Sequence, residues 1–164
     1  MLGEVGNSYD EVKDLEKGYR GEHKGESQFF GDTKIHYMSI HELDAHEVFV
    51  VNGRLYGADG KPIHTTGATA IFVMDPSGAI FVRNKPEFQV YHHSSFLRGD
   101  DVASAGHIVV HDGVIKAINA STGHYRIDPS LNLQFLTELK ARGYDTSSIN
   151  NSFGKQSIDM TQLR

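Results

Sequence analysis

Two short segments of the chain gather imidazole, hydroxyl and phenol groups: residues 91–97, Tyr-His-His-Ser-Ser-Phe-Leu, and residues 121–125, Ser-Thr-Gly-His-Tyr. An imidazole can remove the proton of a serine hydroxyl, and a tyrosine hydroxyl can donate to a developing negative charge. Both segments are expected at strand ends, where a rigid sheet holds polar side chains in place. The candidate catalytic residues are therefore His93, Ser94, Ser95, His124 and Tyr125, in a cleft also lined by His92, with His107 and His111 as outer candidates.

The first segment is expected to be a strand over residues 88–95, which places each histidine on the same face as the serine two positions later. Such positions lie about 7 Å apart in an ideal strand, so a bulge or turn would have to bring the pair within hydrogen-bond reach. The alternative is that these groups satisfy the backbone at a strand end, and that Tyr125 caps the core. The sequence has no Gly-x-Ser-x-Gly elbow, which argues against a serine hydrolase.

Composition limits the classes of function. A chain of 164 residues fits one domain, and the absence of cysteine excludes disulfides, thiolate zinc sites and cysteine nucleophiles. A net charge of −5 argues against nucleic acid as a partner, and no apolar run is long enough to span a membrane. The ten histidines match no zinc signature, so we expect no metal. The N-terminus lacks a Sec signal, so any export would use another route.

The folded domain that carries the candidate site is expected to begin after an N-terminal lead-in. Ser8 and Glu11 form a capping box, and apolar residues follow at helical spacing, which predicts a short N-terminal helix. Residues 20–33 are polar and glycine-rich, which is typical of a mobile connector. We therefore predict a flexible lead-in over 1–33, one domain over 34–146 and a loosely ordered tail over 147–164.

Within that domain, turn residues predict three β-hairpins. Asn52-Gly53 joins strands at 47–51 and 54–57, and residues 75–78, Asp-Pro-Ser-Gly, join strands at 70–74 and 79–83. Asp112-Gly113 would pair His111 with Val114 in the third hairpin. Strand alternation then assigns to the core Ile108, Val110, Ile115 and Ala117, and to the opposite face His107, Val109, His111, Val114, Lys116 and Ile118.

A closing helix is expected to pack on this sheet. Asp128 is its N-cap, Pro129 occupies its first position and Gly143 ends it. The apolar stripe that faces the sheet consists of Leu131, Phe135, Leu136 and Leu139. The fold class is therefore α+β, with an antiparallel sheet built from hairpins, a short N-terminal helix and a C-terminal helix on the sheet.

Four blocks occur in a recognisable order: residues 70–78, residues 91–97, Ala105-Gly106 and residues 122–125. Over residues 48–146 the chain resembles the C-terminal tip domains of bacterial polymorphic toxins of the Rhs type. A related block occurs in plant calmodulin-binding proteins with IQ motifs. The chain departs from the toxin pattern in having Arg126-Ile127-Asp128 before its proline and Thr69 where a basic residue is expected.

The toxin resemblance implies a virulence effector that is secreted or translocated into the cytosol of a target cell by a non-Sec route, together with a cognate immunity protein. We expect an enzyme that acts through the His/Ser/Tyr cluster on a target-cell protein or a small molecule, with the reaction unresolved. One alternative is an ADP-ribosyltransferase toxin, for which NAD would be the cofactor and Glu42, Glu47 or Glu87 would have to lie beside the cluster. Another alternative is a non-catalytic module that binds a host protein, and a nuclease comes third.

Overall fold

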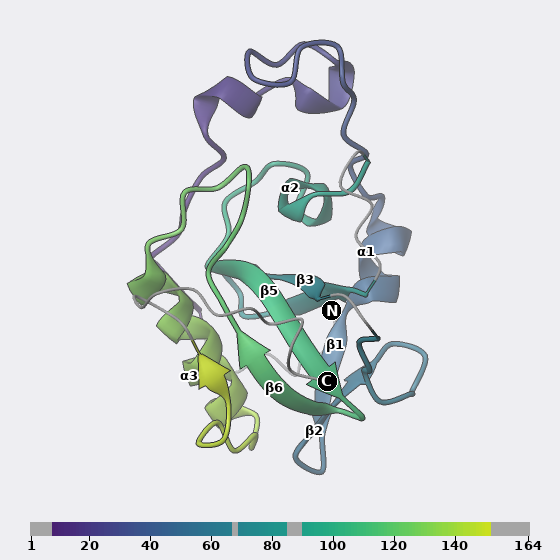
Figure 1. The fold of residues 1–164 in the computed structure, drawn as a ribbon, viewed down its shortest axis with the longest axis vertical. Helices are drawn as coiled ribbons and strands as arrows, with labels where there is room; N and C mark the ends of the chain where they lie inside the picture. Colours follow the sequence, from purple (N-terminus) through teal and green to yellow (C-terminus); the bar gives the residue numbers. More distant parts are fainter. Residues whose placement is uncertain (1–7, 67–68, 85–89, 152–164) are drawn as a thin grey trace.

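The computed structural model describes residues 8–66, 69–84 and 90–151 (Figure 1). Its centre is a five-stranded sheet in the order β4-β3-β5-β6-β7. The strands are β3 (Ala70–Met74), β4 (Ile80–Arg83), β5 (Ser104–His111), β6 (Val114–Ile118) and β7 (Asn150–Asn151). All neighbours pair antiparallel except β6 and β7, and β1 (Val48–Val51) and β2 (Arg54–Gly57) form a separate antiparallel hairpin. The α+β class is confirmed.

The described part of the chain contains three α-helices and three 3-10 helices. The α-helices are α1 (Ile40–His46), α2 (His93–Phe96) and α3 (Leu133–Ala141), and the 3-10 helices are η1 (Lys17–Tyr19), η2 (Glu22–Lys24) and η3 (Pro129–Asn132). The Asp128 side chain accepts from the Ser130 amide and caps η3, and the α-helix begins only at Leu133, so the predicted start of the closing helix is a 3-10 turn that leads into α3. Gly143, with a φ of 88°, follows the end of α3 as predicted. None of the described helices is long and apolar enough to cross a membrane.

The three hairpins form where the turn residues predict them. Asn52 and Gly53 both have the positive φ that a type I′ turn requires, at 51° and 75°. In the third hairpin a bulge between Val109 and Val110 shifts the register, so that Ile108 pairs with Ile118. The predicted faces of Ala117 and Ile118 are therefore wrong: the bulge turns Ile118 into the core with Ile108, and it places Ala117 opposite Val109 on the other face.

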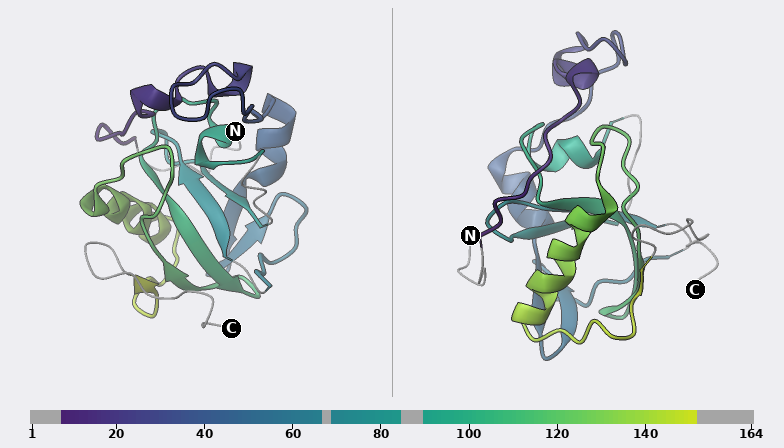
Figure 2. Two further views of the ribbon diagram at one scale, coloured as in Figure 1. Left: turned by 45° about the horizontal axis from the view of Figure 1, so that its top comes forward. Right: turned by 90° about the vertical axis from the view of Figure 1, so that its left-hand side faces the viewer.

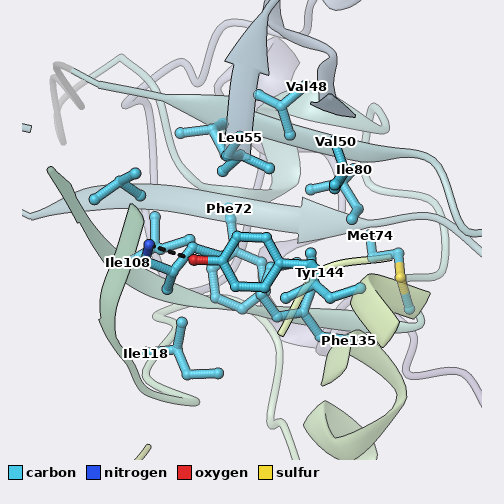
Figure 3. Packing of buried hydrophobic residues seen from close by; sticks show 14 of the residues in the cluster. Val48, Val50, Leu55, Phe72, Met74, Ile80, Ile108, Ile118, Phe135 and Tyr144 are labelled. Carbon is cyan, nitrogen blue, oxygen red and sulfur yellow. Dashed lines mark hydrogen bonds between the residues drawn. The ribbon is translucent and has the colours of Figure 1, made fainter. Parts of the chain in front are cut away.

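Two apolar cores lie on the two faces of the sheet, because side chains alternate along β3. Phe72 and Met74 belong to the core under α3, where the Tyr144 hydroxyl accepts a hydrogen bond of 2.6 Å from the Ile115 amide (Figure 3). Ile71 belongs to the second core, whose other members include Leu15, Met38, Phe81, Phe96, Val102 and Tyr125. Figure 2 shows α3 on one side of the sheet and α2 with the N-terminal segment on the other.

The N-terminal segment differs from the prediction. The helix expected from Ser8 does not form: residues 8–16 run extended, Lys13 pairs with Val102, and Leu15 pairs with Tyr125. Leu15 is buried in the second core, and this tertiary packing outweighs the local helical signal. Residues 20–33, expected to be mobile, include a buried Glu22. The domain boundaries stay a prediction, although β7 extends the sheet into the expected tail.

Candidate functional site

The structure brings Ser94 and His124 together around a third residue, Glu22. The Nδ1 atom of His124 lies 2.6 Å from Oε2 of Glu22 and 3.3 Å from Oγ of Ser94. The other Glu22 oxygen, Oε1, accepts a hydrogen bond of 2.7 Å from the Tyr37 hydroxyl. Glu22 and Ser94 are fully buried and His124 is 1% exposed. Glu22 from η2, Ser94 from α2 and His124 from the loop after β6 thus form a buried polar centre, and the half-buried Tyr37 joins it from the stretch before α1. We call these four residues the Glu22 centre.

The geometry of the Glu22 centre is not that of a catalytic triad. In a triad the carboxylate bonds to one ring nitrogen, and the serine hydroxyl bonds to the other, which takes its proton. Here Glu22 and Ser94 both contact Nδ1 of His124. Burial raises the pKa of the Glu22 carboxyl, but hydrogen bonds from His124, Ser94 and Tyr37 outweigh it and leave that pKa below its usual value. The carboxylate is thus held ionised rather than poised to relay a proton.

Aromatic rings enclose His124 on both faces. Its ring stacks on Tyr19 with 3.9 Å between centroids and on His92 with 4.1 Å, and Phe30 packs edge-on at 4.8 Å. The Nε2 atom of His124 is buried and has no hydrogen-bond partner among the residues that the structure describes. In this conformation, therefore, the imidazole cannot exchange protons with a dissolved substrate.

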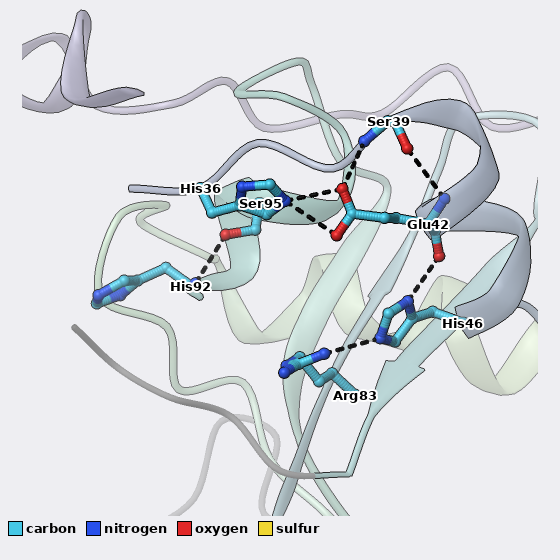
Figure 4. Close-up of polar contacts among 7 residues, drawn as sticks. All are labelled: His36, Ser39, Glu42, His46, Arg83, His92 and Ser95. Atoms are coloured by element: carbon cyan, nitrogen blue, oxygen red, sulfur yellow. Dashed lines mark hydrogen bonds and ion pairs between the residues drawn. The ribbon is translucent and has the colours of Figure 1, made fainter. Parts of the chain in front are cut away.

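The other predicted site residues serve the backbone. His93 donates from Nε2 to the Gly106 carbonyl at 2.7 Å, and burial lowers the pKa of His93 to about 3, which keeps it neutral. Ser95 accepts from the His92 amide at the start of α2 (Figure 4). The Tyr125 hydroxyl donates to the Asp100 carbonyl at 2.7 Å, and burial raises its pKa. These contacts match the structural alternative, while the catalytic role stays a prediction.

The predicted strand over 88–95 is wrong where it is described, because His93–Phe96 forms α2; residues 85–89, and with them Glu87, lie outside the described residues. The serine–histidine contact that forms joins Ser94 of α2 to His124 in the second segment. Of the outer candidates, His107 packs edge-on against His93 at 5.4 Å, whereas His111 lies beside His64 at the far end of β5.

The glutamates considered for a nucleotide-using enzyme lie elsewhere. Glu42 contacts Nε2 of His36 at 2.8 Å and caps α1 through Ser39, in a network that continues from His46 to Arg83 (Figure 4). The Glu47 backbone bridges to Phe81, and burial raises the pKa of its carboxyl. Glu22 had no sequence signal beyond its flanking glycines. Among the described residues, no group of three or more acidic or histidine side chains is placed to hold a metal.

A groove of about 500 Å³ opens on the same side of the sheet, between α1, the end of α2 and the β3–β4 turn. Its apolar lining comes from both helices and from the strand-like stretch before α1, and it includes Met38, Ile40, Leu43, Phe96 and Leu97. The charged residues that line it are Asp75, Arg98, Asp100 and Asp101. Ile40 is 70% exposed, the largest exposed fraction among the large hydrophobic residues of the described chain. We call this feature the α1–α2 groove.

The fold and the site define a small α+β domain with a closed polar centre and an open apolar groove. Residues 42–131 match the model of the IQ motif-containing protein middle domain, and the chain belongs to this family.

Similar curated proteins include three from Arabidopsis thaliana. IQ domain-containing protein IQM5 is 38% identical over 93 residues, which cover 56% of this chain and 19% of the relative. IQM3 is 37% identical over 112 residues (63% and 24%), and IQM1 is 32% identical over 117 residues (70% and 24%). The chain thus spans about a fifth to a quarter of the length of these relatives. No solved structure matches it.

These matches confirm the plant half of the resemblance and overturn the toxin half. The prediction of a secreted or translocated Rhs-type virulence toxin is wrong, because the family and the relatives are IQ motif-containing proteins. The ADP-ribosyltransferase toxin and the immunity partner were parts of that prediction. The shared blocks explain the error: residues 70–78 are the buried strand β3 and its turn, and a Cβ on Gly106 would lie 1.8 Å from the Asn119 carbonyl oxygen. Such blocks report packing rather than activity.

Proposed function

We propose that this domain is a non-catalytic protein-binding module of an IQ motif-containing protein. The α1–α2 groove carries the proposal. Its edge exposes a large apolar side chain, Ile40, beside a preformed apolar cavity, and such a combination marks a place where another chain docks. We therefore prefer the non-catalytic binding module, an alternative in the sequence analysis, to the enzyme.

Two further observations support a binding role. The side chains with catalytic potential, those of Ser94, His124 and Tyr125, are buried and engaged in contacts within the fold. The chain also matches a middle domain and spans only part of its relatives, as expected of a module that works beside other segments.

Substitution of Ile40 tests the proposal. Because Ile40 is 70% exposed, Ile40→Ser removes apolar docking surface at little cost in stability. Leu133→Ser is the matched control, since Leu133 is 51% exposed on α3 and does not line the groove. Partners are captured on immobilised wild-type domain from an extract of the source cells and identified by mass spectrometry. We expect a partner that Ile40→Ser loses and Leu133→Ser retains; equal capture by all three proteins would contradict the proposal.

A further inference from the structure

The charges around the α1–α2 groove indicate which kind of partner it accepts. Three carboxylates line it, those of Asp75, Asp100 and Asp101, against the single guanidinium of Arg98. Asp100 and Asp101 are exposed, and among the described residues neither side chain has a hydrogen-bond or ion-pair partner. The Asp75 carboxylate accepts hydrogen bonds from the backbone amides of Ser77 and Ala79. These neutral donors hold the carboxylate in place without cancelling its negative charge.

The apolar lining is rigid where it meets the core. Phe96 is fully buried and Met38 is 1% exposed, and both belong to the second core. Leu43 and Leu97 are partly buried and pack against the same core. A surface built in this way keeps its shape before a partner arrives, so that little free energy is lost in ordering it.

We infer that the α1–α2 groove binds a cationic amphipathic helix of a partner protein, with apolar side chains on the lining and Lys or Arg beside Asp100 and Asp101. This inference rests on the proposed binding function and adds the chemistry of the ligand. A helix presents apolar side chains one turn apart on one face, which is how peptides enter an apolar groove. The acidic residues select against an acidic partner by repulsion and raise the association rate of a basic one.

The probe for this test is a fluorescein-labelled synthetic peptide of about 14 residues, roughly four helical turns. Leucines stand at positions i, i+3, i+4 and i+7 of its repeat and lysines fill the remaining positions. A second peptide carries glutamate in place of every lysine. Binding to the full chain is followed by fluorescence anisotropy at low and at physiological salt, and circular dichroism verifies the fold of every variant.

We expect the lysine peptide to bind the wild-type chain and the glutamate peptide to bind at least tenfold more weakly. The double variant Asp100→Asn, Asp101→Asn should bind the lysine peptide about fivefold more weakly at low salt, with a smaller difference at physiological salt. The control double variant Asp59→Asn, Asp112→Asn loses the same charge away from the groove, because Asp112 lies at the opposite end of β5 from Ser104, which pairs with β3 beside Asp75. It should bind like the wild type.

The outcomes separate the inference from the proposed function. Equal weakening in the two double variants would mean attraction to net charge alone and would overturn the inference, as would equal binding of the glutamate peptide or no binding of either peptide. In each of these cases the proposed function stands if a captured cellular partner still depends on Ile40. If Ile40→Ser captured the same partners as the wild type, the groove would not be the docking surface, and both the inference and the proposed function would be wrong.

Discussion

Glu22→Gln would show whether the Glu22 centre holds the N-terminal segment against the rest of the fold. Glu22 is fully buried, and its carboxylate lies 2.6 Å from Nδ1 of His124. Glutamine has nearly the same shape, so the substitution removes the charge without opening a cavity. Its side-chain carbonyl can still accept the hydrogen bond from Tyr37.

The expected loss in the free energy of unfolding is about 3 kcal/mol. Removing one partner of a buried ion pair costs about 3–5 kcal/mol, because the other charge stays buried without compensation. The retained Tyr37 hydrogen bond favours the lower end of that range. Since a domain is stabilised by only about 5–15 kcal/mol in total, this loss is easily measured.

Two measurements follow the variant. Urea unfolding gives the global free energy, and limited trypsin digestion reports local opening at Lys17, Arg20 and Lys24, which lie in the N-terminal segment. We expect a lower urea midpoint and faster cleavage at these sites. Glu26→Gln is the control, because Glu26 is exposed in the same segment. Wild-type stability and cleavage in Glu22→Gln, or equal effects in Glu26→Gln, would refute the structural role of the Glu22 centre.

The same pair makes stability depend on pH. The pKa of Glu22 lies below its usual value in the folded protein, so the folded state holds this proton less tightly than the unfolded state does. The contribution of Glu22 is therefore complete above the unfolded-state pKa, near about 4.3, and is lost as the pH falls through the lower folded value. As the pH is lowered, the urea midpoint of Glu22→Gln should therefore fall less than the urea midpoint of the wild type.

Three further predictions concern the interior. Burial lowers the pKa of His93 to about 3, so the unfolded state binds this proton more readily, and stability falls by up to about 1.4 kcal/mol per pH unit below about pH 6.5. In His93→Gln the urea midpoint should depend less on pH over this range. A pH dependence equal to that of the wild type would contradict the lowered pKa of His93. Gly106→Ala should cost about 3 kcal/mol or more, because its Cβ would meet the Asn119 backbone; wild-type thermal stability would show that the strands can separate there. Tyr144→Phe should cost about 1–3 kcal/mol, since the buried Ile115 amide loses its acceptor, and a loss below that range in urea would count against this bond.

Local signals in the sequence were sufficient for much of the fold. Asn52-Gly53 and Asp112-Gly113 set their hairpins, Asp128 caps the 3-10 turn before α3, and Gly143 follows the end of α3. Turns and caps can be predicted because they depend on residues within about four positions of one another. The capping box of Ser39 and Glu42 carried the same kind of signal for α1, which the sequence analysis missed. Even Ser94 and His124 were placed near each other from the hairpin between them.

Only the tertiary structure decided the role of these residues. No local rule brings Glu22 to His124, since 102 positions of chain separate them and the contact depends on how residues 8–33 cross α2. The backbone at Leu15 is extended, because burial of this side chain in the second core outweighs the helical pattern of the neighbouring sequence. Turns and caps are short-range features that the sequence determines. Burial, hydrogen-bond partners and protonation depend on long-range packing, which encloses Ser94 and His124 with Glu22 in a buried polar centre.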